Sequence, residues 1–295
     1  MQLGKLIQDT VDRFTSVGIE DAQSEAVQLL GYHLGLTRSQ LFLHSNREIQ
    51  GQELDQFFDL VRRRTAREPL HYIIGTREFW SMEFFVSPSV LIPRPETEFL
   101  LEQVLKTMYT DGYGKGPILD MCTGSGVIAV VLAKEIGAAS VVAVDCSFDA
   151  LQVAVSNIAR HDKNREISVV CSNLFSALNP AFRFELIVAN PPYIAEPELK
   201  NLQPEVREWE PKTALTAGAK GLDIINILAD QSARYLVPGG WLFVEIGADQ
   251  KDAAREIFRS QINSSFDHVE VIDDWAGRPR VLKARKKDNY GQTDH

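Results

Sequence analysis

The chain has 295 residues, of which 44% are hydrophobic and 24% are charged, and its formal net charge is −9. This length suffices for two domains, and the composition excludes collagen-like, coiled-coil and wholly disordered chains. With 31 basic against 40 acidic residues, the sequence lacks a basic footprint for a phosphate backbone, so no direct nucleic-acid partner is expected.

Residues 1–75 are predicted to form a small helical bundle. Apolar residues recur at intervals of three and four over residues 3–14, 22–30 and 54–61, which is typical of amphipathic helices. The segments that start at Thr37 and Ser45 have the form of helix-capping boxes. Four arginines near the end of the last of these helices are predicted to be a solvated face that suits the negative end of the helix dipole: Arg62, Arg63, Arg64 and Arg67.

Between residues 76 and 98, aromatic residues and prolines replace the helical pattern and predict a β-hairpin or ordered linker. From residue 99 to 285, short apolar runs alternate with helical patterns. This alternation predicts an α/β domain with a mainly parallel sheet covered by helices. The polar tail, residues 286–295, is expected to fray. The expected strands are 117–121, 141–145, 167–171, 186–190, 241–245, 269–272 and 281–284.

A loop containing two glycines follows the first predicted strand of the α/β domain. The segment Thr123-Gly124-Ser125-Gly126 lies between this strand and a helix. Glycines permit a tight turn and let a ligand approach the N–H groups at the helix N-terminus. Asp145, at the end of the second strand, is placed to hold ribose hydroxyls. The pattern indicates a cofactor site that fits a nicotinamide dinucleotide as well as S-adenosylmethionine.

Two further features distinguish between these cofactors. Asp120, just before the loop, can recognise the amino group of a methionine moiety but would repel a pyrophosphate, which favours S-adenosylmethionine. After the third strand, Asn173 is expected to contact the adenine, and Leu174 or Phe175 is expected to cover it.

The fourth strand ends in Asn190-Pro191-Pro192-Tyr193. Two consecutive prolines remove two backbone donors and stiffen the chain, so the carbonyls of Asn190 and Pro191 become fixed acceptors beside the Asn190 side chain. Such acceptors can aim an NH₂ group whose nitrogen is a poor nucleophile, and the Tyr193 ring can cover a planar target. The tetrapeptide predicts methylation of a planar NH₂ group, with Asn190, Pro191 and Tyr193 as catalytic residues and all four residues as the substrate site.

Together these motifs resemble those of the release-factor glutamine methyltransferases of the HemK/PrmC family. The resemblance extends over nearly the whole chain, and its most specific segment is Pro93-Arg94-Pro95-Glu96-Thr97-Glu98. Other matching segments are Arg77-Glu78-Phe79-Trp80, Glu210-Pro211, Thr213-Ala214-Leu215 and Ala276-Gly277-Arg278.

The resemblance implies a helical N-terminal domain that recognises the substrate, a hairpin linker, and a seven-stranded, Rossmann-like methyltransferase domain whose last strand pair is antiparallel. It also implies methyl transfer from S-adenosylmethionine to the side-chain amide nitrogen (N5) of the glutamine in the Gly-Gly-Gln motif of peptide-chain release factors. Cys122 departs from the glycine common at its position, and Asn173-Leu174 departs from an acidic residue followed by an aromatic. The cofactor contacts that the resemblance assigns are Cys122, Thr123, Gly124, Ser125, Gly126, Asp145, Leu174 and Asn190.

The predicted setting is the cytoplasm, with release factors as partners, no membrane association and a monomeric chain. The N-terminus fits neither a signal peptide nor a membrane helix. The three cysteines lack the spacing of a zinc site, so no metal is expected: Cys122, Cys146 and Cys171.

Other functions compete with this hypothesis. The alternative substrates are a ribosomal-protein glutamine, and the adenine N6 of a nucleic acid, which would need a basic face that the sequence lacks. A nicotinamide-dependent oxidoreductase, or a cofactor-binding module without activity, would leave Asn190-Pro191-Pro192-Tyr193 without a role.

Overall fold

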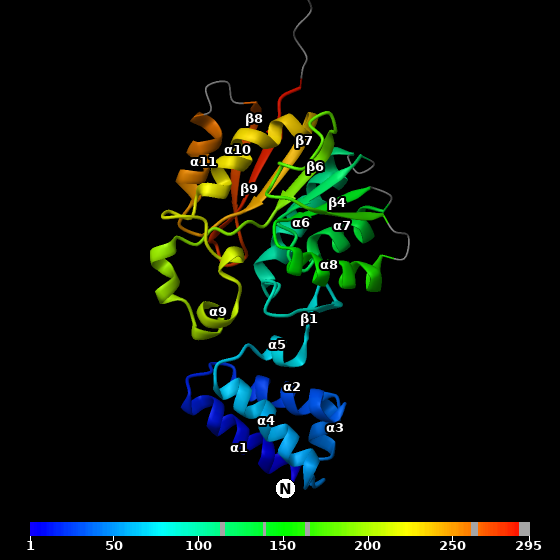
Figure 1. The fold of residues 1–295 in the computed structure, drawn as a ribbon, viewed down its shortest axis with the longest axis vertical. Helices are drawn as coiled ribbons and strands as arrows, with labels where there is room; N and C mark the ends of the chain where they lie inside the picture. Colours follow the sequence, from blue (N-terminus) through cyan, green and yellow to red (C-terminus); the bar gives the residue numbers. More distant parts are fainter. Residues whose placement is uncertain (113–115, 138–139, 163–165, 261–264, 289–295) are drawn as a thin grey trace, which may run out of the picture. The chain divides into compact units, whose positions relative to one another are not determined.

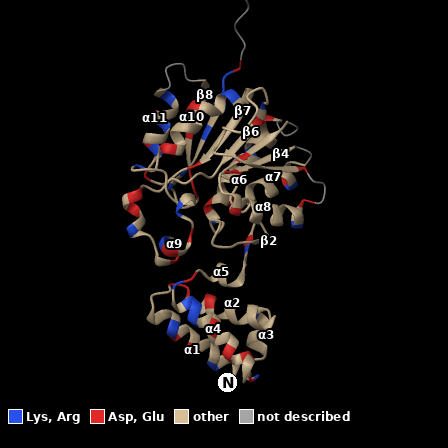
Figure 2. Cartoon of the chain, in the orientation of Figure 1, with Lys and Arg blue, Asp and Glu red and all other residues tan. Residues whose placement is uncertain are grey.

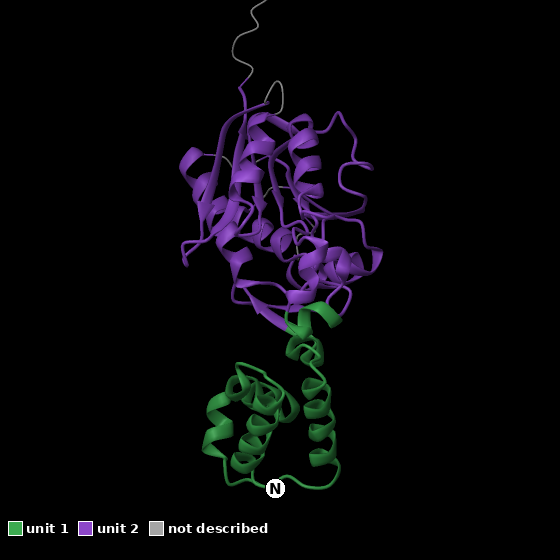
Figure 3. Cartoon of the chain, turned by 90° about the vertical axis from the view of Figure 1, so that its left-hand side faces the viewer, with its two compact units in different colours: residues 1–76, 203–209 green, residues 77–202, 210–295 purple. Residues whose placement is uncertain are grey.

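The computed structural model describes residues 1–112, 116–137, 140–162, 166–260 and 265–288 (Figure 1). Acidic and basic residues are intermixed on its helices (Figure 2). The chain divides into two compact units (Figure 3). The first, the helical unit, comprises Met1–Thr76 and Gln203–Trp209, and the second, the sheet unit, comprises Arg77–Leu202 and the chain from Glu210 onward. Within the described ranges, no helix is long and apolar enough to cross a membrane.

The helical unit consists of short helices around one apolar core. The spacing read from the sequence matches the buried face of its first helix, in which Leu6 and Phe14 are fully buried. The helices are α1 (Leu3–Ser16), α2 (Ala22–Leu34), α3 (Arg38–Leu43), α4 (Gln52–Thr65), α5 (Leu70–Ile74) and α9 (Pro204–Trp209).

One of the two predicted capping boxes is present. Thr37 caps α3, since its side chain accepts a hydrogen bond from Gln40 N while the Gln40 side chain accepts one from Thr37 N. The prediction at Ser45 is wrong, because α4 begins only at Gln52. The backbone around Ser45 instead pairs with the start of the chain, as its carbonyl accepts a hydrogen bond from Gly4 N at 2.9 Å.

The prediction of a solvated arginine face is wrong for Arg64, which is only 3% exposed. Its guanidinium donates to Glu25 Oε2 at 2.5 Å and to Glu205 Oε1 at 2.9 Å. Arg67 donates to the other oxygen of Glu205 at 2.6 Å. A charged group is buried only when it is paired, and one of the two carboxylates that pair with Arg64, that of Glu205, belongs to α9. The structure thus groups Gln203–Trp209 with the helical unit, although these residues fall within the predicted α/β domain.

A two-stranded hairpin lies near the start of the sheet unit, in the segment predicted as a hairpin or linker. Its strands are β1 (Thr76–Phe79) and β2 (Met82–Phe85). The two residues that join them, Trp80 and Ser81, have φ of 52° and 54°. Positive φ at both central residues is typical of the tight turns that match strand twist.

The sheet unit is built on a seven-stranded sheet in the order β5-β4-β3-β6-β7-β9-β8, which confirms the predicted fold class. Strands β3 to β7 are parallel, and β9 is antiparallel to both β7 and β8. The strands are β3 (Ile118–Met121), β4 (Val141–Asp145), β5 (Ile167–Cys171), β6 (Phe184–Ala189), β7 (Leu236–Glu245), β8 (Phe266–Asp273) and β9 (Pro279–Lys286).

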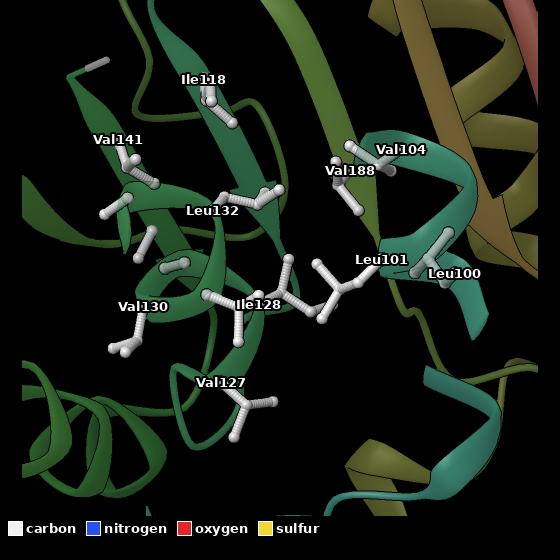
Figure 4. Packing of buried hydrophobic residues seen from close by; sticks show 14 of the residues in the cluster. Leu100, Leu101, Val104, Ile118, Val127, Ile128, Val130, Leu132, Val141 and Val188 are labelled. Atoms are coloured by element: carbon white, nitrogen blue, oxygen red, sulfur yellow. The ribbon is translucent and has the colours of Figure 1, made fainter. Parts of the chain in front are cut away.

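Helices bury both faces of this sheet (Figure 1). Neighbouring residues of β3 point to opposite faces: Ile118 packs with α6, α7 and α8, and Leu119 packs with α10 and α11. Figure 4 shows the first cluster, in which Leu101 and Ile128 lie near Val188 of the sheet. The helices are α6 (Pro95–Asp111), α7 (Val127–Ile136), α8 (Phe148–His161), α10 (Asp223–Tyr235) and α11 (Lys251–Ser260).

The strand order reverses beside β3, since β4 and β5 extend the sheet in one direction and β6 and β7 extend it in the other. In parallel sheets of this kind, ligands bind at the carboxyl ends of the strands next to such a reversal. The loops after β3, β4, β5 and β6 all begin at that edge.

Candidate functional site

A cavity of about 370 Å³ lies at this edge of the sheet. Its wall includes residues that follow four successive strands, from β3 to β6. Most of the residues predicted for the site are therefore brought together. Those that line the cavity are Cys122, Thr123, Gly124, Ser125, Asp145, Asn173, Leu174, Asn190 and Pro192, whereas Asp120, Gly126, Pro191 and Tyr193 do not.

The loop after β3 turns sharply through three residues with positive φ: Cys122 at 62°, Gly124 at 53° and Gly126 at 82°. A Cβ at Gly124 would meet nothing within 4 Å, whereas a Cβ at Gly126 would lie 3.2 Å from the Cβ of Ala154. Gly126 thus permits close packing on α8, and Gly124 keeps the backbone open to the cavity. Cys122 carries a cost of about 1 kcal/mol for its left-handed conformation, which is why glycine suits this position.

Asp145 holds the same loop from the neighbouring strand. Its Oδ2 accepts a hydrogen bond from Gly124 N at 2.9 Å, and its Oδ1 accepts one from Ser147 N at 2.9 Å. Each carboxylate oxygen has two lone pairs, so both keep capacity to accept from a ligand hydroxyl. Asp145 lies in the cavity wall, where such a hydroxyl can reach it.

Asp120 lies behind the loop and is fully buried. It shares the face of β3 with Ile118, against α7, because side chains alternate along a strand. Its Oδ2 accepts hydrogen bonds from Thr123 Oγ1 at 2.5 Å and Ala129 N at 3.0 Å, while its Oδ1 has no partner among the described residues. Burial raises the pKa of Asp120 to about 7, although these hydrogen bonds lower it. Asp120 therefore supports the loop from behind and is not among the residues that line the cavity.

The loop after β5 shows which apolar residue can cover a bound ring. Leu174, with φ of 50°, lines the cavity. Phe175 is instead buried in the core, where its ring stacks on Tyr235 with a centroid distance of 4.7 Å. Of the two residues predicted for this role, only Leu174 is available, and Asn173 lies beside it in the wall.

The segment after β6 places the Asn190 amide group in the cavity wall. Asn190 Nδ2 donates to Thr97 Oγ1 at 3.0 Å, and Asn190 Oδ1 accepts no hydrogen bond from any described residue. The Tyr193 hydroxyl donates to Glu245 Oε1 at 3.3 Å. Burial and the nearby Glu245 carboxylate raise the pKa of Tyr193, so its hydroxyl stays protonated at neutral pH.

Sequence reasoning missed Glu245, the last residue of β7 and only 1% exposed. Its Oε2 accepts a hydrogen bond from Thr97 Oγ1 at 2.8 Å. Burial raises the pKa of Glu245 to about 7, although the Thr97 hydroxyl and the charge of Arg280 lower it. The available signal was an apolar strand that ends in glutamate at the ligand-binding edge of the sheet.

The segment from residue 88 to 98 does more than join domains. It lines the cavity through Ser89, Val90, Leu91, Pro93 and Thr97. Arg94, in the same segment, forms an ion pair with Glu210, whose carboxylate is almost fully buried. Burial raises the pKa of Glu210, and the Arg94 charge opposes this effect. The pair fixes the chain just before Pro211, which also lines the cavity.

Known proteins share both the sequence and the fold of this chain. Residues 5–75 match the model of the PrmC N-terminal domain, and residues 95–204 match that of the methyltransferase small domain. The release factor glutamine methyltransferase of Koribacter versatilis is 42% identical over 258 residues, covering 88% of this chain and 89% of that protein. That of Geobacter sulfurreducens is 41% identical, covering 91% of each.

Among solved structures, a 16S rRNA N2 G1207 methyltransferase of T. thermophilus in complex with AdoMet and guanosine has a TM-score of 0.51. It is 20% identical and covers 72% of this chain and 50% of that one. At this identity the likeness concerns the fold alone.

Proposed function

This chain belongs to the family of release factor glutamine methyltransferases, and from this membership we propose that it methylates the side-chain amide nitrogen (N5) of a glutamine in a peptide-chain release factor, with S-adenosylmethionine as methyl donor. One observation carries the proposal for this chain. Asn190, whose Oδ1 accepts no hydrogen bond from a described residue, lines the same cavity as Asp145, so an amide acceptor and a ribose acceptor share one site.

The residues of the cavity fit S-adenosylmethionine. Asp145 can accept from ribose hydroxyls, the backbone at Gly124 is open to a ligand, and Asn173 and Leu174 can contact the adenine. Asp120 stays a predicted ligand of the methionine amino group. Its hydrogen bond from the Thr123 hydroxyl also supports the loop that lines the cavity. When bound, S-adenosylmethionine supplies an electrophilic methyl group.

The chain's own residues have to orient a weak nucleophile. The lone pair of an amide nitrogen is delocalised into its carbonyl. Asn190 Oδ1 can accept one N–H of the glutamine, and the Pro191 carbonyl stays the predicted acceptor of the other, although Pro191 does not itself line the cavity. Two such acceptors would aim the nitrogen and stabilise the positive charge that develops on it. Holding the two reactants in line contributes several kcal/mol, so no strong general base is needed. The surplus proton can leave to water after the transfer.

The helical unit is proposed to recognise the release factor. A glutamine side chain offers few atoms, and every protein has glutamines, so selectivity has to come from surface outside the cavity. The family resemblance places the target in a Gly-Gly-Gln motif. The chain is proposed to act as a monomer. Because translation termination takes place in the cytoplasm, that compartment is part of the proposal.

Intact-mass spectrometry tests the proposal directly. A release factor incubated with the protein and S-adenosylmethionine should gain one methyl group, whereas the same factor with its motif glutamine changed to alanine should gain none. Ribosomal proteins and an adenine-containing oligonucleotide, incubated in parallel, should stay unmodified. Methylation of either control in preference to the release factor would replace this proposal with the corresponding alternative.

A further inference from the structure

A line of hydrogen bonds connects a buried carboxylate with the amide at the cavity. It runs from Glu245 Oε2 to Thr97 Oγ1 over 2.8 Å, and from Thr97 Oγ1 to Asn190 Nδ2 over 3.0 Å. The three residues come from the end of β7, the start of α6 and the segment after β6. Thr97 is 2% exposed and Glu245 is 1% exposed, so water has little access to the line.

The direction of these hydrogen bonds decides which end of the Asn190 amide faces the substrate. A threonine hydroxyl has one proton to donate and lone pairs with which to accept. Because that proton is given to Glu245, Thr97 can only accept from Asn190, and it therefore binds Nδ2. The amide oxygen is left for the cavity. A reversed Thr97 hydroxyl would bind Oδ1 and turn Nδ2, a donor, toward the substrate NH₂.

The surroundings of Glu245 favour a role as acceptor. Its second oxygen, Oε1, accepts from the Tyr193 hydroxyl at 3.3 Å. From β9, Arg280 acts on Glu245 through its positive charge, and it is itself paired with Asp274. Glu96 of α6 is the other charged group that acts on Glu245, with the opposite effect. Among the described residues, the side chains that donate hydrogen bonds to Glu245 are thus the hydroxyls of Thr97 and Tyr193, and Glu245 acts as acceptor in both.

We propose that Glu245 is a positioning residue, which acts through Thr97 to keep the Asn190 amide oxygen turned toward the substrate amide. This inference rests on the proposed function, since it assigns Asn190 Oδ1 to the glutamine NH₂. Glu245 does not line the cavity, so it acts through Thr97 without contact to the reacting atoms.

The arrangement depends on the ionisation of Glu245. Once protonated, the carboxyl group can donate to Thr97 Oγ1, which frees the Thr97 proton to point at Asn190 Oδ1. Burial raises the pKa of Glu245 to about 7. The carboxylate therefore orients Asn190 above this pH, and the orientation weakens as the pH falls through it. Wild-type kcat should decrease from pH 8 to pH 6.

The experiment compares Thr97→Val with Thr97→Ser in methylation of an intact release factor. Valine keeps the shape of threonine but removes its hydroxyl, so kcat should fall by about 10- to 100-fold. Serine retains the hydroxyl and should stay within about threefold of wild type. All rates are measured at saturating cofactor, and calorimetry gives the cofactor affinity of each variant, so that a change in kcat is separated from a change in cofactor binding. Thr107→Val is the matched control, since Thr107 lies buried in the same helix but bonds only the Gln103 carbonyl.

Glu245→Gln supplies a second measurement that does not depend on the fold of the Thr97 variants. Glutamine cannot titrate, so the decrease of kcat from pH 8 to pH 6 should disappear. The inference would be overturned if Thr97→Val and Thr97→Ser had equal kcat, or if kcat of Glu245→Gln still decreased from pH 8 to pH 6. Methylation by the wild-type protein would leave the proposed function in place in either case. Failure of the wild-type protein to methylate any release factor would instead refute the proposed function, and this inference with it.

Discussion

Asp145 is the residue on which we expect cofactor affinity to depend most directly. Asp145→Ala should weaken the binding of S-adenosylmethionine by about 1 to 3 kcal/mol, because it removes a charged acceptor for the ribose. It also frees Gly124 N and Ser147 N, which the carboxylate now holds. Isothermal calorimetry measures the change. Asp149→Ala is the control, since Asp149 is exposed in the same segment and does not line the cavity. Equal affinity of a folded Asp145→Ala variant and wild type would remove Asp145 from the site.

Asn190 should matter for turnover more than for binding. Asn190→Ala removes the acceptor that aims the amide, so kcat should fall by roughly 100-fold or more. Tyr193→Phe retains the ring and should lower kcat much less, although it removes the hydroxyl that donates to Glu245. Single-turnover rates with saturating cofactor separate these effects from affinity. Near-normal methyl transfer by Asn190→Ala would refute the role given to the tetrapeptide.

Helix α9 is bound to the rest of the helical unit by the carboxylate of Glu205. Burial opposes its ionisation, but hydrogen bonds from Arg67 and Arg64 lower the pKa of Glu205 below its ordinary value. A lowered folded-state pKa means that the carboxylate stabilises the fold above its ordinary pKa. This stabilisation is lost as the pH falls through the folded-state value.

Glu205→Gln should accordingly weaken the attachment of residues 203–209 by about 1 to 3 kcal/mol at neutral pH. Hydrogen exchange of these residues measures the effect, which should shrink toward acidic pH. Glu208→Gln is the matched control, because Glu208 lies on the same helix in an exposed pair with Arg207, where little stability is expected. Identical exchange in the two variants would contradict the anchoring role of Glu205.

At the scale of the whole molecule, the helical unit exposes large apolar side chains that its own core does not use. Phe42 is 53% exposed and Leu43 is 81% exposed, both on α3. If this unit recognises the release factor, changing both to serine should raise KM for the intact factor by about tenfold with kcat unchanged. A short glutamine peptide should be methylated equally by variant and wild type. Val155→Ser, at an exposed position of the sheet unit, is the control. An unchanged KM of the Phe42 and Leu43 double variant for the intact factor would exclude α3 from recognition.

Much of this architecture could be predicted from the sequence because the signals are local. Apolar runs predict the strands, and Gly124 with Gly126 predicts a turn into a helix. The roles of Glu245 and Glu205 could not be predicted, because they depend on contacts with Thr97 and Arg64, which lie far away in the chain. The supporting role of Asp120 in the loop could not be predicted either, because it depends on the alternation along β3 that directs its side chain to α7.

We expect one glutamine side chain of a release factor to be the methyl acceptor. Tandem mass spectrometry of the factor, after incubation with this protein and S-adenosylmethionine, identifies the modified atom. A single added methyl group is expected on the side-chain amide of the Gly-Gly-Gln glutamine, and none is expected in a parallel incubation with the Asn190→Ala variant. An unmodified glutamine, or a methyl group found on another residue, would contradict this expectation.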